Sequence, residues 1–244
     1  MDVPFLLLMA AVGVLAGAVA SVSGFGIGSL LTPLLALRVG TKLAVAAVSI
    51  PHVVATALRF WIMRKEVDRK LLWSFGLMSA AGGLVGALLQ SYAESPLLTV
   101  IFGLLLTSTG LMQSTGISQR LRFHGPMAWA AGGISGLLGG LVGNQGGIRS
   151  AAMLGFDVSP RAFVATATAV GVIVDAARMP VYLVTQGKEI AGLWPELASA
   201  TVGAVVGTLI GDRILRRLPE PIYRRIVGVL ILALGIYMLF RAAE

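Results

Sequence analysis

The chain has 244 residues, of which 57% are hydrophobic and 12% are charged, and its formal net charge is +8. Soluble domains carry roughly 25% charged residues, so this composition argues against a soluble globular enzyme, a disordered chain and a coiled coil. The basic residues lie mostly in short gaps between apolar runs, as they do in cytoplasmic loops of membrane proteins and not in a nucleic-acid interface. We expect an all-α polytopic protein that has the lipid bilayer as a partner and binds no nucleic acid.

A span needs about 20 apolar residues, so the chain can hold about eight hydrophobic elements. In chain order the apolar runs are 4–22, 29–37, 41–63, 71–90, 96–113, 126–143, 148–156, 160–185, 190–211 and 221–240. Gly-rich breaks separate the first run from the second and the sixth from the seventh. Ala18-Val19-Ala20 would fit a signal-peptide cleavage site, but Met1-Asp2-Val3-Pro4 carries no basic residue, so we expect the first run to be retained.

Shifting the sequence by 119 residues reveals an internal repeat. At this shift Gly13, Gly17, Ala20, Ser21, Gly24 and Gly28 fall on Gly132, Gly136, Gly139, Gly140, Gly143 and Gly147, and Arg59 falls on Arg178. At a shift of 125, Pro96, Gly103 and Gly110 fall on Pro221, Gly228 and Gly235. We predict one integral membrane domain made of a first repeat, 1–113, a cytoplasmic linker, 114–125, and a second repeat, 126–244.

The placement of basic loops predicts that the repeats are inverted. Four basic residues lie in 64–70 of the first repeat, whereas the equivalent gap 186–190 holds a single one, Lys188. The next gap reverses this pattern, because 90–96 holds no basic residue and 212–225 holds five. Under the positive-inside rule, loops 64–70, 114–125 and 212–220 are cytoplasmic, and both termini lie outside the plasma (inner) membrane. Each repeat then needs a re-entrant or broken first helix followed by three transmembrane helices.

The two Gly-rich tips are the predicted substrate site. They comprise Ser23, Gly24, Phe25, Gly26 and Gly28 in the first repeat, and Asn144, Gln145, Gly146, Gly147 and Arg149 in the second. Unwound backbone is tolerated in a membrane where it is buried in protein or lines a wet cavity. Each following half-helix presents free N–H groups and a positive dipole end, which attract an anion. The alternative is that the glycines only permit close packing, which we prefer for Gly13, Gly17, Gly132 and Gly136.

The first tip carries a family resemblance. Gly24-Phe25-Gly26-Ile27-Gly28-Ser29-Leu30-Leu31-Thr32-Pro33-Leu34-Leu35 resembles the signature of the sulfite exporter TauE/SafE-like family of membrane permeases. The second tip resembles that family's second copy more loosely, and the likeness extends over nearly the whole chain. The resemblance implies transport of small sulfur-containing anions, such as sulfite or organosulfonates. It places the glycine motif on Gly24, Gly26, Gly28 and Pro33, and on Gly143, Gly146 and Gly147. The chain departs from the motif at Asn144-Gln145 and at Ala152, where the partner of Pro33 would stand, which leaves the substrate open.

Three arginines lie within or close to apolar runs. A cation at mid-membrane costs at least about 2.5 kcal/mol, so Arg149 is expected to meet an anion or a carboxylate. Its alternatives are snorkelling to the headgroups and a salt bridge with Asp157. Arg59 and Arg178 are candidate gate residues that draw an anion in from each side, and their alternative is also snorkelling.

Two further titratable residues are candidates for gating or coupling. Asp175 lies one turn before Arg178 and could pair with it, as a structural latch or a proton-sensitive switch. His52 could bind the substrate or carry a proton, although a histidine satisfied by backbone is the commoner case. The chain has no cysteine, and His52 and His124 are far apart, so we expect no metal. Gly24-x-Gly26-x-Gly28 is not a nucleotide fingerprint, and we expect no cofactor.

These observations favour a secondary transporter that moves a small anion by alternating access. Export needs no coupling ion, because an inside-negative potential supplies about 2.3 kcal/mol per charge per 100 mV, whereas uptake would need one, such as a proton. The alternatives are a passive anion channel with much faster flux, an intramembrane enzyme, for which no nucleophile–base pair is evident, and a structural scaffold. A homodimer also remains open, since the Gly82-x-x-x-Gly86 and Gly203-x-x-x-Gly207 ridges could pack within or between protomers.

Overall fold

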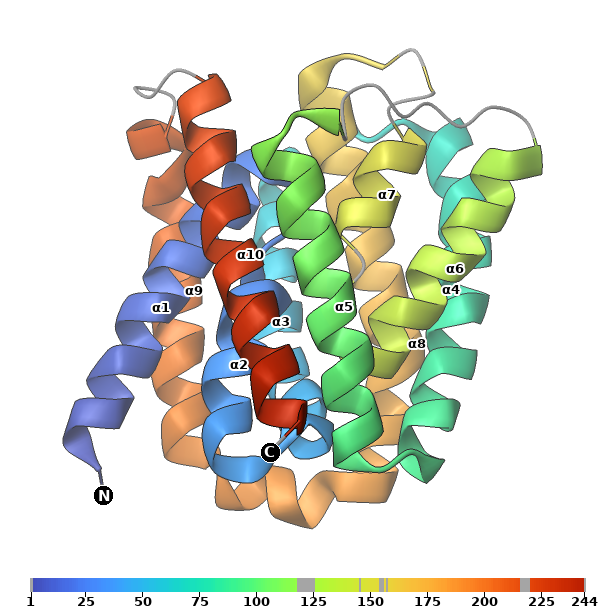
Figure 1. The fold of residues 1–244 in the computed structure, drawn as a ribbon. Coiled ribbons are helices and arrows are strands. Elements are labelled where there is room, and N and C mark those ends of the chain that lie inside the picture. The colour runs from blue at the N-terminus through green and yellow to red at the C-terminus, as the bar shows by residue number, and fades with distance from the viewer. Residues whose placement is uncertain are drawn as a thin grey trace.

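The computed structural model describes residues 2–117, 126–144, 146–153, 156, 158–215 and 220–243, and every regular element in them is a helix (Figure 1). The elements are α1 (Val3–Ser23), α2 (Ile27–Val39), α3 (Thr41–Met63), η1 (Arg64–Glu66), α4 (Arg69–Tyr92), α5 (Ser95–Ser114), α6 (Pro126–Val142), α7 (Gly146–Met153), α8 (Pro160–Gly192), α9 (Trp194–Leu215) and α10 (Glu220–Ala243). The prediction of an all-α polytopic membrane protein is confirmed. Gln145 and Asp157 lie outside the described residues.

Six of the described helices are long and apolar enough to cross a membrane, namely α1, α3, α4, α5, α8 and α10. This set differs from the sequence prediction, in which α9 was a plain span and α1 part of a broken element. Helix α1 has 21 residues without a charge, whereas α9 carries Glu196 in its first turn and Arg213 in its last. Helix length alone therefore does not decide which helices cross the membrane. The direction that the chain takes after α1 also matters.

Both predicted breaks are present. Helix α1 ends at Gly24, where φ is 78°, and α6 ends before Gly143, where φ is 74°. These left-handed conformations are open to glycine, which stops a helix without a steric penalty, and the two glycines are equivalent at the 119-residue shift. Figure 1 shows α2 returning toward the end of the bundle where α1 begins, and α7 returning toward the opposite end, where α6 begins. The two hairpins thus enter the bundle from opposite ends.

Each hairpin packs on the other half of the chain. Helix α1 lies along α9, α6 lies along α4, α5 lies along α10, and α3 crosses α8. Let α1 to α5 of the first half correspond in order to α6 to α10 of the second. The α1–α9 pair then corresponds to the α6–α4 pair, whereas α5–α10 and α3–α8 each join a helix to its own counterpart in the other half. An approximate two-fold relation between the halves produces this pattern, so the pairing supports the predicted inverted repeat.

Glycines bring the paired helices into close contact. A Cβ on Gly13 would lie 2.7 Å from the carbonyl oxygen of Ala200, and a Cβ on Gly136 would overlap the carbonyl oxygen of Ser79. The contact is reciprocal, because a Cβ on Gly86 would overlap the carbonyl oxygen of Leu137, and one on Gly207 that of Val14. The ridges on α4 and α9 are therefore used within one protomer, as close-packing stripes.

The ends of the helices separate into two groups. In Figure 1 both chain termini lie at the lower end of the bundle. Element η1 lies at the upper end, as do the end of α5, the start of α6, the end of α9 and the start of α10. These upper helix ends flank the three loops that were predicted to be cytoplasmic. The helices that the three loops connect therefore end on the same side of the bundle, as the prediction requires.

Helix α8 continues through the predicted gap at 186–190. It kinks at Gln186, where φ is −138° and ψ is 16°, and ends at Gly192. The side chain of Gln186 donates to Oε1 of Gln90 at 3.1 Å, and Gln90 donates to the carbonyl oxygen of Lys42 at 2.8 Å. The helix changes direction at this buried amide network instead of ending, which the sequence pattern did not indicate.

We predict that Gly136→Ala lowers the free energy of unfolding by about 1–3 kcal/mol, because the added methyl overlaps the backbone of α4. Thermal unfolding of the purified protein in detergent micelles measures this loss. Gly187→Ala is the matched control, since a Cβ there meets nothing within 4 Å. Equal midpoints for the two variants would contradict close packing of α6 on α4.

Candidate functional site

The two Gly-rich tips meet inside the bundle. A Cβ on Gly28, in the first turn of α2, would overlap the carbonyl oxygen of Gly143 at the second tip. The ring of Phe25 occupies the space that a side chain on Gly146 would take. The structure therefore brings most of the predicted site residues together. Each tip occupies the space into which a side chain on the other tip would extend.

The polar groups of the tips are largely engaged within their own hairpins. The hydroxyl of Ser23 lies 2.8 Å from the carbonyl oxygen of Val19 and 2.7 Å from that of Phe25. Oδ1 of Asn144 accepts from the backbone N–H of Gly146 at 3.4 Å, whereas its Nδ2 is buried without a partner among the described residues. Because the ring of Phe25 covers the start of α7, the free N–H groups of this helix are less open to a ligand than the sequence suggested.

The carbonyl ends of the broken helices instead hold side-chain donors. Nη2 of Arg149 donates to the carbonyl oxygen of Gly24 at 3.0 Å, and Nη1 of Arg178 donates to that of Gly139 at 2.5 Å. The hydroxyl of Tyr182 donates to the carbonyl oxygen of Gly140. The last carbonyls of a helix lack partners and form the negative end of its dipole, so they stabilise a cation there. The breaks thus anchor two buried arginines.

Helices α3 and α8 face each other through three successive pairs of residues. Nδ1 of His52 lies 2.7 Å from Oδ2 of Asp175, and Nε of Arg59 donates to Oγ1 of Thr168 at 2.8 Å. Between these pairs, Cγ2 of Thr56 lies 3.3 Å from the position that a Cβ on Gly171 would take. The intervals of three and four residues on each helix keep these groups on one face. A polar seam therefore runs along the contact between the two halves.

Asp175 joins the first of these pairs to Arg178. Oδ1 of Asp175 accepts from Nε of Arg178 at 2.9 Å and lies 2.7 Å from its Nη2 in an ion pair, while Oδ2 faces His52. The side chains of Asp175 and Arg178 are 0% and 2% exposed. The carboxylate thus compensates the arginine inside the bundle, and Arg178 pairs with Asp175 as the sequence allowed.

No carboxylate among the described residues pairs with Arg59 or Arg149 in this way. Arg59 is 4% exposed and Arg149 is 3% exposed, so neither snorkels to a membrane surface. Nη1 of Arg59, Nε and Nη1 of Arg149 and Oγ1 of Thr56 are all buried and have no hydrogen-bond partner among the described residues. Nη1 of Arg149 lies 3.4 Å from the Cβ position on Gly171, on which Thr56 also packs. We call Arg59, Arg149, Thr56 and Gly171 the arginine cradle.

The cradle carries an excess of positive charge. The two arginines act on each other electrostatically, and Asp175, the nearby carboxylate that acts on both, is already paired with Arg178. Among the described interior residues, three arginines stand against one carboxylate when His52 is neutral. A buried cation without a counter-charge is costly, and a bound anion reduces this cost.

The two halves differ at equivalent positions. At the 119-residue shift Arg59 corresponds to Arg178, and Thr56 corresponds to Asp175. The arginine of the second half therefore has a carboxylate one turn before it, whereas that of the first half has a threonine. Within the described part of the chain, a carboxylate therefore neutralises Arg178, and no carboxylate neutralises Arg59.

Several sequence interpretations of single residues change. His52 bonds to Asp175 and not to backbone, so the commoner case that we had considered for it is wrong. The sequence analysis did not identify Gly171 or Tyr182 as residues of the site. Gly171 could have been found, because it corresponds to His52 at the 119-residue shift. Gly147 lies within α7, one residue after its start.

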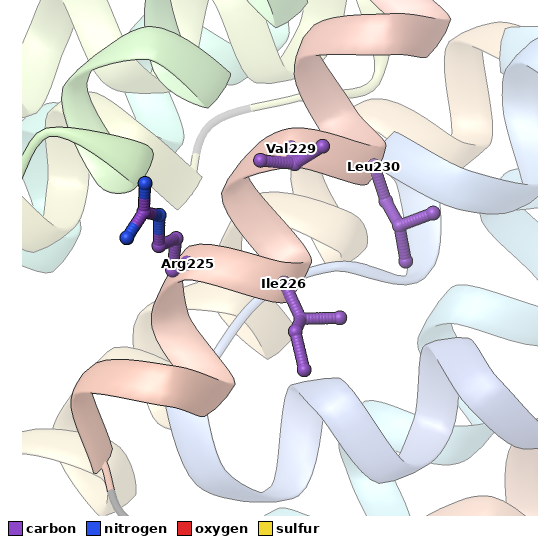
Figure 2. Close-up of a pocket in the computed structure, with 4 residues that line it drawn as sticks. All are labelled: Arg225, Ile226, Val229 and Leu230. Carbon is purple, nitrogen blue, oxygen red and sulfur yellow. The ribbon is translucent and has the colours of Figure 1, made fainter.

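A surface hollow lies away from these groups. Figure 2 shows it on the N-terminal part of α10, lined by Arg225, Ile226, Val229 and Leu230. The three aliphatic side chains are between 40% and 51% exposed. None of its lining residues belongs to the tips or to the α3–α8 seam, so this hollow is not the predicted anion site.

Comparison with known proteins identifies the family. A sequence model of the sulfite exporter TauE/SafE family matches residues 9–238, which include both tips and the whole polar seam. No curated protein and no solved structure matches the chain significantly. The match covers nearly the full length of 244 residues, and six helices are suited to span a membrane. The chain therefore belongs to the sulfite exporter TauE/SafE family and is a multi-pass membrane transporter.

Proposed function

We propose that the protein is a secondary transporter of a small oxyanion, sulfite or an organosulfonate, which binds in the arginine cradle. The observation that supports this most directly is that Arg59 and Arg149, which act on each other electrostatically, both have buried N–H groups without partners among the described residues. Buried donors of this kind are costly unless a ligand satisfies them. A guanidinium donates through a planar fork that matches the oxygens of an oxyanion, and Thr56 adds a hydroxyl.

Alternating access fits the arrangement better than a permanent pore. The tips obstruct one another where Phe25 packs on Gly146 and Gly28 packs on Gly143. The cradle lies at the contact of α3 with α8, which belong to different halves, so a relative motion of the halves would open it toward one end or the other. A passive anion channel remains the alternative, and a flux that does not saturate with anion concentration would favour it.

We predict that Arg149→Gln and Arg59→Gln each weaken anion binding by about tenfold or more, because each removes a charged donor worth about 1.5–3 kcal/mol. Isothermal titration of the purified protein with sulfite, sulfate and methanesulfonate measures the affinities. Arg161→Gln is the matched control, since the side chain of Arg161 is 68% exposed at the upper end of the bundle.

Gly171→Ala supplies a steric version of the same test. Its methyl would stand 3.4 Å from Nη1 of Arg149 and 3.3 Å from Cγ2 of Thr56, so it narrows the cradle without changing its charge. Affinities for all three anions that equal the wild-type values in Arg149→Gln, Arg59→Gln and Gly171→Ala would overturn the cradle as the binding site.

We also propose that the upper end of the bundle in Figure 1 faces the cytoplasm. Arg64 and Lys65 belong to η1, Arg69 and Lys70 to the first turn of α4, and Arg161 pairs with Glu66 of η1, while Arg213 is in the last turn of α9 and Arg225 near the start of α10. Among the described residues, the opposite end has fewer basic side chains: Arg38 pairs with Asp2, Lys42 is in the first turn of α3, Lys188 follows the kink of α8, and Arg241 is in the last turn of α10. The positive-inside rule assigns the more basic end to the cytoplasm of the plasma (inner) membrane, which leaves both termini outside.

The absence of cysteine makes this orientation directly testable. In Lys188→Cys we expect a membrane-impermeant maleimide to label intact cells, whereas Lys65→Cys should react only after permeabilisation. Both lysines are exposed, so access to the thiol depends on its side of the membrane. Labelling of Lys65→Cys in intact cells would reverse the assignment.

A further inference from the structure

His52 and Asp175 form a buried pair that can hold a proton. Both oxygens of Asp175 are engaged, one by Arg178 and the other by Nδ1 of His52, so the carboxylate is held in its ionised form. An ionised carboxylate only accepts hydrogen bonds, and Nδ1 of His52 must therefore carry a hydrogen. The second ring nitrogen, Nε2, is then the atom that gains or loses a proton.

His52 is also the member of this group that a proton can reach. Its side chain is 11% exposed, whereas those of Asp175 and Arg178 are 0% and 2% exposed. The charges that act on His52 come from Arg59 on its own helix and from Asp175 and Arg178 on α8. Asp175 in turn interacts with Arg149 of α7 and with Tyr182 of α8. The other elements that pack on α3, namely α2, α5, α6, α9 and η1, add no charge to this set within the described part of the chain.

The arginine cradle lies on the same face of α3 as His52. Thr56 and Arg59 follow His52 by four and seven residues, which corresponds to about 6 and 10 Å along a helix. A negative charge at that distance in a buried site favours the protonated imidazole. Binding of an anion and protonation of His52 therefore assist each other, and this coupling is reciprocal.

We propose that His52 takes up a proton at Nε2 when an anion enters the arginine cradle, so that the protein moves anion and proton together. This inference rests on the proposed function, because it requires an anion in the cradle. The proton comes from water, and the Nδ1–H of His52 stays on Asp175 throughout. At the 119-residue shift the counterparts of His52 and Asp175 are Gly171 and Thr56, which have no titratable group. The coupling of anion binding to protonation therefore belongs only to the end of the seam where His52 lies.

Proton uptake on anion binding tests the proposal without any variant. Sulfate and methanesulfonate keep their own protonation state between about pH 5 and 8, the range in which a histidine titrates. Either anion is added to purified wild-type protein in weakly buffered solution with a pH-indicator dye. We expect the solution to become more alkaline by up to one proton per anion bound, in proportion to the occupancy.

The pH dependence of the affinity provides the matched comparison. We expect wild-type protein to bind the anion about fivefold or more tightly at pH 5 than at pH 8, because coupling energies of this kind are about 1–3 kcal/mol. In His52→Gln, which retains an N–H that can face Asp175, the dependence and the proton uptake should both be lost. His124→Gln, which alters the other histidine of the chain, should behave as wild type.

The outcomes separate this inference from the proposed function. Equal wild-type affinities at the two pH values, or binding without proton uptake, would overturn the proton coupling and leave the anion site standing. The same dependence in His52→Gln as in wild type would also overturn it, since another group would then carry the proton. If wild-type protein binds neither anion at any pH, the anion site fails and the inference fails with it. Should His52→Gln not fold, the wild-type dye measurement still decides.

Discussion

An arginine inside an apolar bundle must find a counter-charge or oriented dipoles, and the interior of this protein is arranged around that constraint. Arg178 has a carboxylate and the carbonyl of Gly139 near the end of α6, and Arg149 has the carbonyl of Gly24 at the end of α1. Those carbonyls are available because the helices stop at buried left-handed glycines inside the bundle. The helix breaks and the buried cations therefore support each other, because the breaks leave carbonyl oxygens that accept from Arg149 and Arg178, and the arginines add hydrogen bonds at these buried helix ends.

The sequence analysis predicted the backbone features well, because they leave local marks. A glycine that ends a helix, an apolar run and a basic loop can each be recognised from a few neighbouring residues, and the breaks at Gly24 and Gly143 were found in this way. The role of the breaks was foreseen only in part. That the positive N-terminal ends of α2 and α7 face a ligand stays a prediction, and the sequence did not indicate that the negative ends of α1 and α6 hold arginines or that Phe25 covers the start of α7.

Side-chain partners were harder to predict, because they depend on segments that are far apart in the chain. His52 and Asp175 are separated by 123 positions, and Arg149 reaches a carbonyl 125 positions away. Considered singly, each of these residues fits a common role, a backbone-bonded histidine or a snorkelling arginine. These residues come together because α3 packs on α8 and because the two tips meet. Neither contact can be predicted from the periodicity or the charge counts of the sequence. The kink at Gln186 was missed for the same reason, since its amide partner is on α4.

The pairing of each hairpin with a late helix of the other half has a consequence for biogenesis. The backbone of α1 fits closely against α9, which is its most extensive contact, and this contact cannot form before α9 has been synthesised. More than half of the chain separates the end of α1 at Ser23 from the start of α9 at Trp194. At a synthesis rate of roughly 5–20 residues per second, the nascent α1 waits about 10–35 s in the lipid for its permanent neighbour. The packing of the first hairpin is therefore completed only after most of the second half has been synthesised.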